Sequence, residues 1–242
     1  MARTLIRNAT VISMDPNVGD LQRGDILING SKIAAISHSI PAEDAEIIDA
    51  SNQIAIPGFV DTHRHTWESL LRATGPDWSL AQYFTGVRVV MGGLYTPEDN
   101  YVANLLGALD ALSGGITTLY DWSHNNNSPE HSDASVQGLK DAGMRGVFGY
   151  GNSNAEWFPP NTLPTNYDDF RRVRKQHFTS DDQLVTMAMA SRGPQFATID
   201  ITEKDFLTAR ELGVRVTVHV GDGLWGFNRP LVQMAARNLL RD

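Results

Sequence analysis

The sequence predicts an α/β fold in which a small all-β region precedes a parallel sheet. Two observations support this prediction. Short runs rich in Ile, Val and Thr fill the first 56 residues, and after Gly58 apolar strands alternate with amphipathic helices that end at glycines. Strands that alternate with such helices form parallel sheets, because each helix returns the chain to the starting edge of the sheet.

The all-β region is marked by five short runs of strand-forming residues. The turn sequence Asn29-Gly30-Ser31 between two of them is typical of a hairpin. We therefore assign residues 1–56 to one domain and residues 57–242 to a second. The expected strands are Thr4–Ser13, Asp25–Asn29, Lys32–Ser37, Glu46–Asp49 and Gln53–Ile56.

In the second region the order helix, glycine, strand is repeated. Its first long helix is well marked, because Thr96 suits the N-cap and Pro97 suits the first turn. The expected strands begin at Phe59, Ile116, Arg145, Leu184 and Val214. The expected helices are Thr96–Gly114, Ala134–Ala142, Tyr167–His177, Thr202–Leu212 and Arg229–Leu240. Five such strands fit a doubly wound sheet of flavodoxin type, and they also fit a (β/α)8 barrel through its fifth unit.

The composition excludes several classes of function. The net charge of −8 and the pI near 5.3 argue against nucleic acid or an anionic membrane as a partner, because both are polyanions. The chain has no cysteine, which excludes disulfides, thiolate zinc sites and cysteine nucleophiles. Neither a signal peptide nor an apolar membrane span is visible, so we expect a soluble cytoplasmic protein.

Three histidines lie at predicted strand ends. His63 and His65 close the first strand of the second region, and residues two apart in a strand point to the same side. His219 lies at the end of the strand that begins at Val214. Three imidazoles from two strand ends leave an open coordination position for water, as catalytic zinc sites require. The alternatives are chance packing of the first pair and a buried structural role for His219.

The residues around these histidines resemble a known family. The segment Ile56-Pro57-Gly58-Phe59-Val60-Asp61-Thr62-His63-Arg64-His65 resembles the first-strand signature of the amidohydrolase superfamily. Gly24–Gly30 and Ile33–Ile36 are similar to the start of that family's β-sandwich, and Thr217–Val220 is similar to its fifth strand. Gly115–Asp121 is typical of the branch that contains cytosine and guanine deaminases and triazine chlorohydrolases. The resemblance implies a partial (β/α)8 barrel, with strands 1–5, preceded by part of a small β-sandwich.

The resemblance also implies a reaction, a metal-dependent hydrolysis of C–N or C–Cl bonds in a cyclic nitrogen-containing small molecule. His63, His65 and His219 are the implied ligands of one divalent ion, Zn²⁺ or alternatively Fe²⁺ or Mn²⁺, which lowers the pKa of a bound water. Asp222 stands where many relatives have a catalytic Glu, and its alternative role is to open a turn before Gly223. The strand Leu184–Ala190 has no lysine to bridge a second ion, which favours one metal.

Other residues near the expected site are candidates for substrate contact. Glu68 lies three residues after His65, where relatives often carry a polar residue that contacts substrate. The aromatic side chains after the first two strands have two possible roles, stacking on a heterocycle or closing the mouth of the barrel. The candidates for substrate binding are Glu68, Trp67, Trp122, His124 and Arg192.

The family pattern includes two residues with no counterpart in this sequence, a metal-binding histidine on the sixth strand and an aspartate on the eighth. We therefore expect the sequence to correspond to the N-terminal portion of the family fold. The alternative function is an incomplete, non-catalytic fragment or one half of a split enzyme. We expect a homo-oligomer or a complementary chain, because a sheet that ends at its fifth strand has two unpaired edges.

Overall fold

The computed structural model describes residues 2–152, 162–221 and 228–241 of the chain. The chain divides into two compact units, Met1–Gly58 and Phe59–Asp242. Within the described residues, no helix combines the length and the apolar character needed to cross a membrane.

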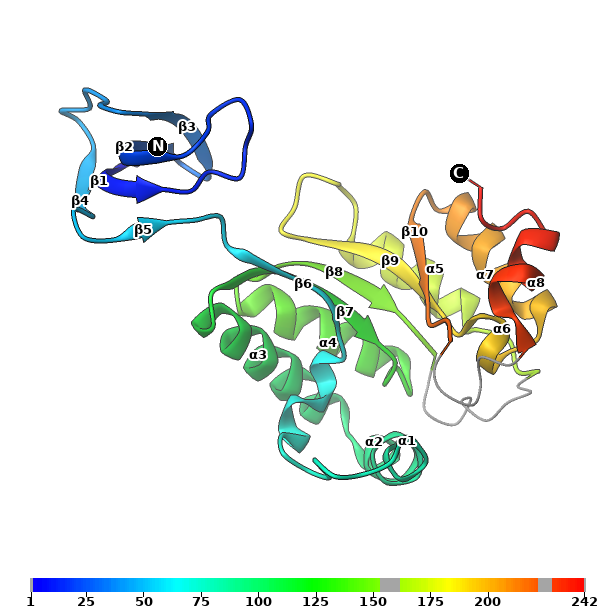
Figure 1. Cartoon of the computed structure of the whole chain (residues 1–242). Coiled ribbons are helices and arrows are strands. Elements are labelled where there is room, and N and C mark those ends of the chain that lie inside the picture. Colours follow the sequence, from blue (N-terminus) through cyan, green and yellow to red (C-terminus); the bar gives the residue numbers. More distant parts are fainter. Residues whose placement is uncertain (1, 153–161, 222–227, 242) are drawn as a thin grey trace. The chain divides into compact units, whose positions relative to one another are not determined.

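The first unit is one mixed sheet (Figure 1). Strand β1 pairs antiparallel with β2, which pairs antiparallel with β3, while β4 and β5 both run parallel to β1. The hairpin between β2 and β3 was predicted, and Gly30 at its turn has a φ of 59°, which glycine adopts without strain. The strands are β1 (Arg3–Val11), β2 (Leu21–Asn29), β3 (Lys32–Ser37), β4 (Glu46–Asp49) and β5 (Ile54–Ala55).

The second unit contains a curved, all-parallel sheet (Figure 1). Its order is β10-β9-β8-β7-β6, so strands that follow one another in the chain also pair. A doubly wound sheet reverses this order at one point, whereas a (β/α)8 barrel does not. The flavodoxin-type alternative is therefore wrong, and the predicted partial barrel is confirmed. The strands are β6 (Phe59–Arg64), β7 (Ile116–Ser123), β8 (Arg145–Tyr150), β9 (Val185–Ser191) and β10 (Arg215–Val218).

The helices that connect these strands bury an apolar core against the sheet. Buried side chains of four helices, such as Val136 and Phe170, pack with Leu119, Phe148 and Met187 of the strands. Burial of such side chains stabilises a fold by roughly 1.5–3 kcal/mol each. The main helices are α3 (Pro97–Ser113), α4 (Pro129–Asp141), α5 (Tyr167–His177), α7 (Ile199–Glu211) and α8 (Pro230–Ala236).

Three helix boundaries differ from the sequence prediction by three residues or more. Helix α7 begins at Ile199 instead of Thr202. Helix α4 begins at Pro129 instead of Ala134, because Pro is accommodated at the first helical position and its first turns bury polar side chains such as Ser132. Helix α8 ends at Ala236, and Asn238 has a left-handed φ of 56° that a continued helix does not allow.

Short helical pieces that the sequence analysis did not predict follow two strands. They follow the carboxyl ends of these strands, and active sites of barrel folds lie at this end. After β6 come η1 (Thr66–Leu71), α1 (Leu80–Tyr83), η2 (Phe84–Met91) and α2 (Gly92–Leu94), and after β9 comes α6 (Gly193–Phe196).

Candidate metal and substrate site

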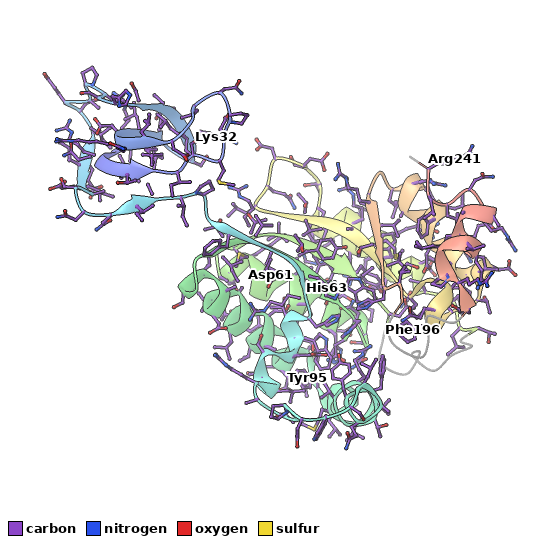
Figure 2. The ribbon with its side chains drawn as sticks, in the orientation of Figure 1. Lys32, Asp61, His63, Tyr95, Phe196 and Arg241 are labelled. Atoms are coloured by element: carbon purple, nitrogen blue, oxygen red, sulfur yellow. The ribbon has the colours of Figure 1, made fainter. Side chains whose placement is uncertain are left out.

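Three imidazole rings meet at the carboxyl ends of β6 and β10. His63 lies near the end of β6 (Figure 2), and His65 directly follows this strand. Their ring centroids are 4.9 Å apart. Arg64 between them forms an ion pair of 3.4 Å with Asp110 of α3. His219 directly follows β10. One ring nitrogen from each histidine lies within 4.8 Å of the others. The structure therefore brings the three predicted ligands together from the ends of two strands.

The ring of His65 is oriented by a backbone group. Its Nδ1 donates a hydrogen bond of 2.9 Å to the carbonyl oxygen of Trp122, which directly follows Asp121 on β7. Because a carbonyl only accepts, the proton of the neutral ring is on Nδ1, and Nε2 keeps its lone pair for a metal. Burial lowers the pKa of His65 to about 3, so the ring is neutral at physiological pH.

A second contact from β7 supports the same segment. The carboxylate of Asp121 accepts a hydrogen bond of 3.0 Å from the backbone N–H of Thr66, the residue after His65. Asp121 is fully buried, and this burial raises the pKa of its carboxyl to about 7. Strand β7 thus holds the end of β6 at two points. Three converging imidazoles, one of them with its tautomer fixed, fit a zinc ion with an open fourth position.

A cavity of about 630 Å³ adjoins the histidines. One part of its wall is apolar and the other part is polar and largely buried. A cavity of this size and composition is typical of small-molecule sites. The lining residues are His65, Glu68, Leu80, Tyr83, Phe84, Arg88, His124, Phe196, His219 and Gly221.

Glu68 is the acidic side chain in this lining. Burial raises the pKa of its carboxyl to about 7, although a hydrogen bond from Tyr83 and the charge of Arg88 act in the opposite direction. The hydroxyl of Tyr83 donates that hydrogen bond to Oε1 over 2.5 Å. A carboxyl with a pKa near neutrality can exchange a proton with a bound ligand at physiological pH.

Arg88 and His124 form the most deeply buried polar pair in the lining. Arg88 is 1% exposed and His124 is 3% exposed. The guanidinium donates to Nδ1 and to the carbonyl oxygen of His124, over 2.7 and 2.9 Å. Burial lowers the pKa of Arg88 to about 10 and holds the pKa of His124 well below its usual value. The cavity therefore has a charged guanidinium and a neutral imidazole at neutral pH.

The other residues predicted for substrate contact are placed differently. Trp67 and Trp122 are fully buried, and neither belongs to the described lining of the cavity. The indole N–H of Trp67 donates to His124 instead, over 2.8 Å. Arg192 is also buried, and its guanidinium donates to the carbonyl oxygen of Leu163. Asp222, the predicted catalytic acid, lies outside the described residues.

Sequence reasoning missed the contribution of the segment between residues 79 and 91. Tyr83, Phe84 and Arg88 all come from α1 and η2, which had not been expected. One signal for α1 was present. Ser79 and Gln82 form a reciprocal capping box, a pattern that marks helix starts.

The chain matches one family model and several known proteins. The model of the amidohydrolase family matches residues 54–231. The 5′-deoxyadenosine deaminase of Methanosarcina barkeri is 30% identical over 151 residues, which cover 62% of this chain and 34% of that protein. The 5-methylthioadenosine/S-adenosylhomocysteine deaminase of Symbiobacterium thermophilum is 27% identical over 241 residues, 98% of this chain and 52% of that protein. This chain thus spans between a third and about half of their lengths.

Solved structures show the same fold. The atrazine chlorohydrolase of Arthrobacter aurescens, complexed with zinc, has a TM-score of 0.79 at 23% identity, over 98% of this chain and 58% of that one. The adenosine deaminase of Xanthomonas campestris, with bound zinc, has a TM-score of 0.70 at 20% identity, over 99% and 56%. The family match extends over most of the chain and includes all three histidines. This chain belongs to the amidohydrolase family.

Proposed function

We propose that this chain carries the metal centre and substrate cavity of a zinc-dependent aminohydrolase. The reaction is hydrolytic removal of an amino group, or of a halide, from a cyclic nitrogen-containing small molecule. The observation that supports it best is the convergence of His63, His65 and His219 beside a cavity of about 630 Å³. The deaminase relatives and the zinc-bound structural neighbours act as independent support.

The residues of the site have three roles in the proposed reaction. His63, His65 and His219 would hold one zinc ion, which when bound supplies a water of lowered pKa as the nucleophile. Trp122 and Asp121 keep His65 in place through the carbonyl and carboxylate contacts described above. The apolar side chains of the cavity pair with the faces of a flat ring and exclude water from it.

The proposed role of Glu68 is to exchange a proton with the leaving amino group. Hydrolytic deamination adds the elements of water and releases ammonia, so one proton must reach the departing nitrogen. The carboxyl of Glu68 holds a hydrogen bond from Tyr83 and has a pKa near 7, so it can accept an N–H of the amine or give a proton to it. Asp222 remains the predicted acid from the sequence pattern.

The test is product formation by purified protein loaded with zinc. The panel contains 5′-deoxyadenosine, 5-methylthioadenosine, S-adenosylhomocysteine and atrazine, and the assay measures released ammonia and chloride. We expect product from at least one compound and none from the His219→Ala variant. Equal product from both proteins would refute the proposed site.

A second candidate function follows from the comparison of lengths. The matched part is 34–52% of the two deaminases described above. In this proposal the reaction also needs residues from a complementary chain or segment. Zinc bound by the three histidines together with no product from the whole panel would favour this second candidate.

A further inference from the structure

Helix α6 lies against the end of the strand that leads to His219. Gly193, the first residue of α6, has a φ of 66°, and a methyl group on it would lie 2.2 Å from Cγ2 of Val218, the last residue of β10. This close approach requires glycine, because any side chain would overlap Val218. The pairing of β10 with β9 ends at this point, with Val218 opposite Ser191. The residues from His219 onward are therefore positioned by contacts outside the sheet.

One such contact comes from the side chain of Gln195 in α6. Its Oε1 accepts a hydrogen bond of 2.6 Å from the backbone N–H of Gly221, two residues after His219. An N–H can only donate, so the amide of Gln195 must present its oxygen to Gly221. Gln195 is 2% exposed. A buried polar group that loses such a bond has no water to replace it, so the contact is costly to break.

The start of α6 is fixed to a buried carboxylate. The hydroxyl of Ser191 accepts a hydrogen bond of 3.2 Å from the backbone N–H of Gly193 and donates one of 2.7 Å to Asp205 of α7. Asp205 is fully buried and also accepts hydrogen bonds from the hydroxyls of Thr165 and Tyr167, over 2.6 and 2.9 Å. Helix α6 thus has a firm attachment to the core of the second unit and reaches from there to the segment after β10.

We propose that Gln195 is a positioning residue for the metal ligand His219. Its hydrogen bond to Gly221 holds the backbone beyond His219 and thereby the direction of the imidazole. The ring of His219 lies 4.7 Å from that of His63, between centroids, and is parallel to that of His65 within 9°. Contacts that orient a metal ligand typically contribute about 10–100-fold to metal affinity. The inference rests on the proposed function, because it takes the three histidines as zinc ligands.

Hydrogen exchange of the Gly221 amide tests the contact itself in the wild-type chain. The protein is ¹⁵N-labelled, freed of metal with a chelator, transferred to D₂O and followed by NMR. Gly221 is an exposed residue, so its amide would exchange at the rate of an unstructured peptide if Gln195 did not accept its hydrogen bond. We expect exchange slowed about fivefold or more. Exchange at the unstructured rate would overturn the proposal.

The role toward the metal is tested by the zinc affinity of the Gln195→Met variant, measured by competition with a chromogenic chelator. Methionine has a similar length, and its sulfur is only a weak acceptor for the Gly221 N–H. We expect the affinity for zinc to fall about tenfold relative to the wild type. An unchanged affinity would overturn the proposal.

The matched control is the same substitution at the opposite end of β9. The side chain of Gln183 donates hydrogen bonds to the backbone carbonyl oxygens of His177 and Val185, over 3.1 and 2.6 Å. Gln183→Met therefore also removes contacts between a glutamine side chain and the backbone, but far from the histidines. We expect it to leave the zinc affinity unchanged, and an equal loss in both variants would overturn the proposed role of Gln195.

A double-mutant cycle shows whether Gln195 acts through His219. In the His219→Ala background two imidazoles remain, and calorimetry measures their weaker binding of zinc. We expect Gln195→Met to have no effect in this background, because the ligand that it positions is gone. The same tenfold loss in both backgrounds would overturn the proposal. A wild-type chain that binds no zinc would contradict the proposed function and this inference together, whereas zinc binding that is insensitive to Gln195→Met would contradict this inference alone.

Discussion

Replacing Glu68 with glutamine isolates the energetic effect of burying a carboxyl in the cavity. Glutamine has nearly the same shape and does not titrate. Its carbonyl oxygen can still accept the hydrogen bond from Tyr83. The Glu68→Gln variant therefore removes the charge and keeps the main contact of the side chain.

The size and the sign of the expected change in stability follow from the pKa of Glu68. Burial raises the pKa of Glu68 from 4.5 to about 7, so the folded protein binds this proton more tightly than the unfolded chain. The stability contributed by the protonated group is complete below pH 4.5 and is lost as the pH rises toward 7. At about 1.36 kcal/mol per pKa unit, the change is about 3 kcal/mol. Between pH 4 and pH 8, the free energy of unfolding of the variant should therefore rise by about 3 kcal/mol relative to that of the wild type.

The assay is urea unfolding of both proteins at several pH values between 4 and 8, after removal of metal. Metal removal matters, because a cation near the carboxyl lowers its pKa. Other groups, including the buried Asp121, contribute equally to both proteins and cancel in the difference. The Glu98→Gln variant, at an exposed position, controls for the loss of a charge. A difference between Glu68→Gln and wild type that stays constant with pH would refute the reasoning.

Three further substitutions test two contacts near the site and one contact between helices α3 and α4. Asp121→Ala removes the buried acceptor of the Thr66 N–H, and we expect the free energy of unfolding to fall by about 1–3 kcal/mol in urea denaturation. Gly138→Ala places a methyl carbon 2.6 Å from a backbone carbonyl oxygen of α3, and we expect a loss of about 1–3 kcal/mol in the same assay. Tyr83→Phe removes a hydrogen bond to the Glu68 carboxylate, and we expect the pKa of Glu68 to rise by about one unit in a ¹³C NMR titration.

Each of these substitutions has a control or a contrary result. Asp121→Asn keeps an acceptor oxygen, so its loss of stability should be smaller than that of the alanine variant. Gly93→Ala meets no atom within 4 Å and should leave stability within about 0.5 kcal/mol of the wild type. A fall in the pKa of Glu68 in the Tyr83→Phe variant would contradict the assigned direction of that hydrogen bond.

Much of the fold of the second unit was predictable because its signals are local. The helix from Pro97 to Ser113 has its cap, its apolar stripe and its terminal glycine within one stretch of sequence. The strands that end at His63 and His219 are short apolar runs between such helices. Because parallel strands place their carboxyl ends at one edge, the meeting of the histidines was also expected.

The wall of the cavity was less predictable because it depends on tertiary packing. The segment that carries Tyr83 and Arg88 consists of two short, consecutive helical pieces of different type, α1 and η2. A charged side chain such as Arg88 is expected at the surface by default, and only its contacts with His124 explain its burial. Local sequence patterns contain no information on such a pairing between residues 36 positions apart.

The roles of the aromatic residues near the site also depend on tertiary packing and could not be predicted from local sequence. The sequence correctly places Trp67 and Trp122 near the carboxyl ends of the first two barrel strands, although Trp122 belongs to β7 instead of following it. The sequence left open whether they stack on a ligand or fill space. In the structure Trp67 supports His124 through its indole N–H, a role that depends on a contact between residues 57 positions apart.

Metal content per chain tests the central claim most directly. Purified protein is treated with a chelator, reloaded with zinc, freed of excess metal by gel filtration and measured by atomic absorption. The three-histidine site predicts about one tightly bound zinc ion per wild-type chain, its loss in His63→Ala, and its retention in the control His38→Ala, whose ring lies in the first unit. Wild-type protein with no more zinc than the His63→Ala variant would contradict the account.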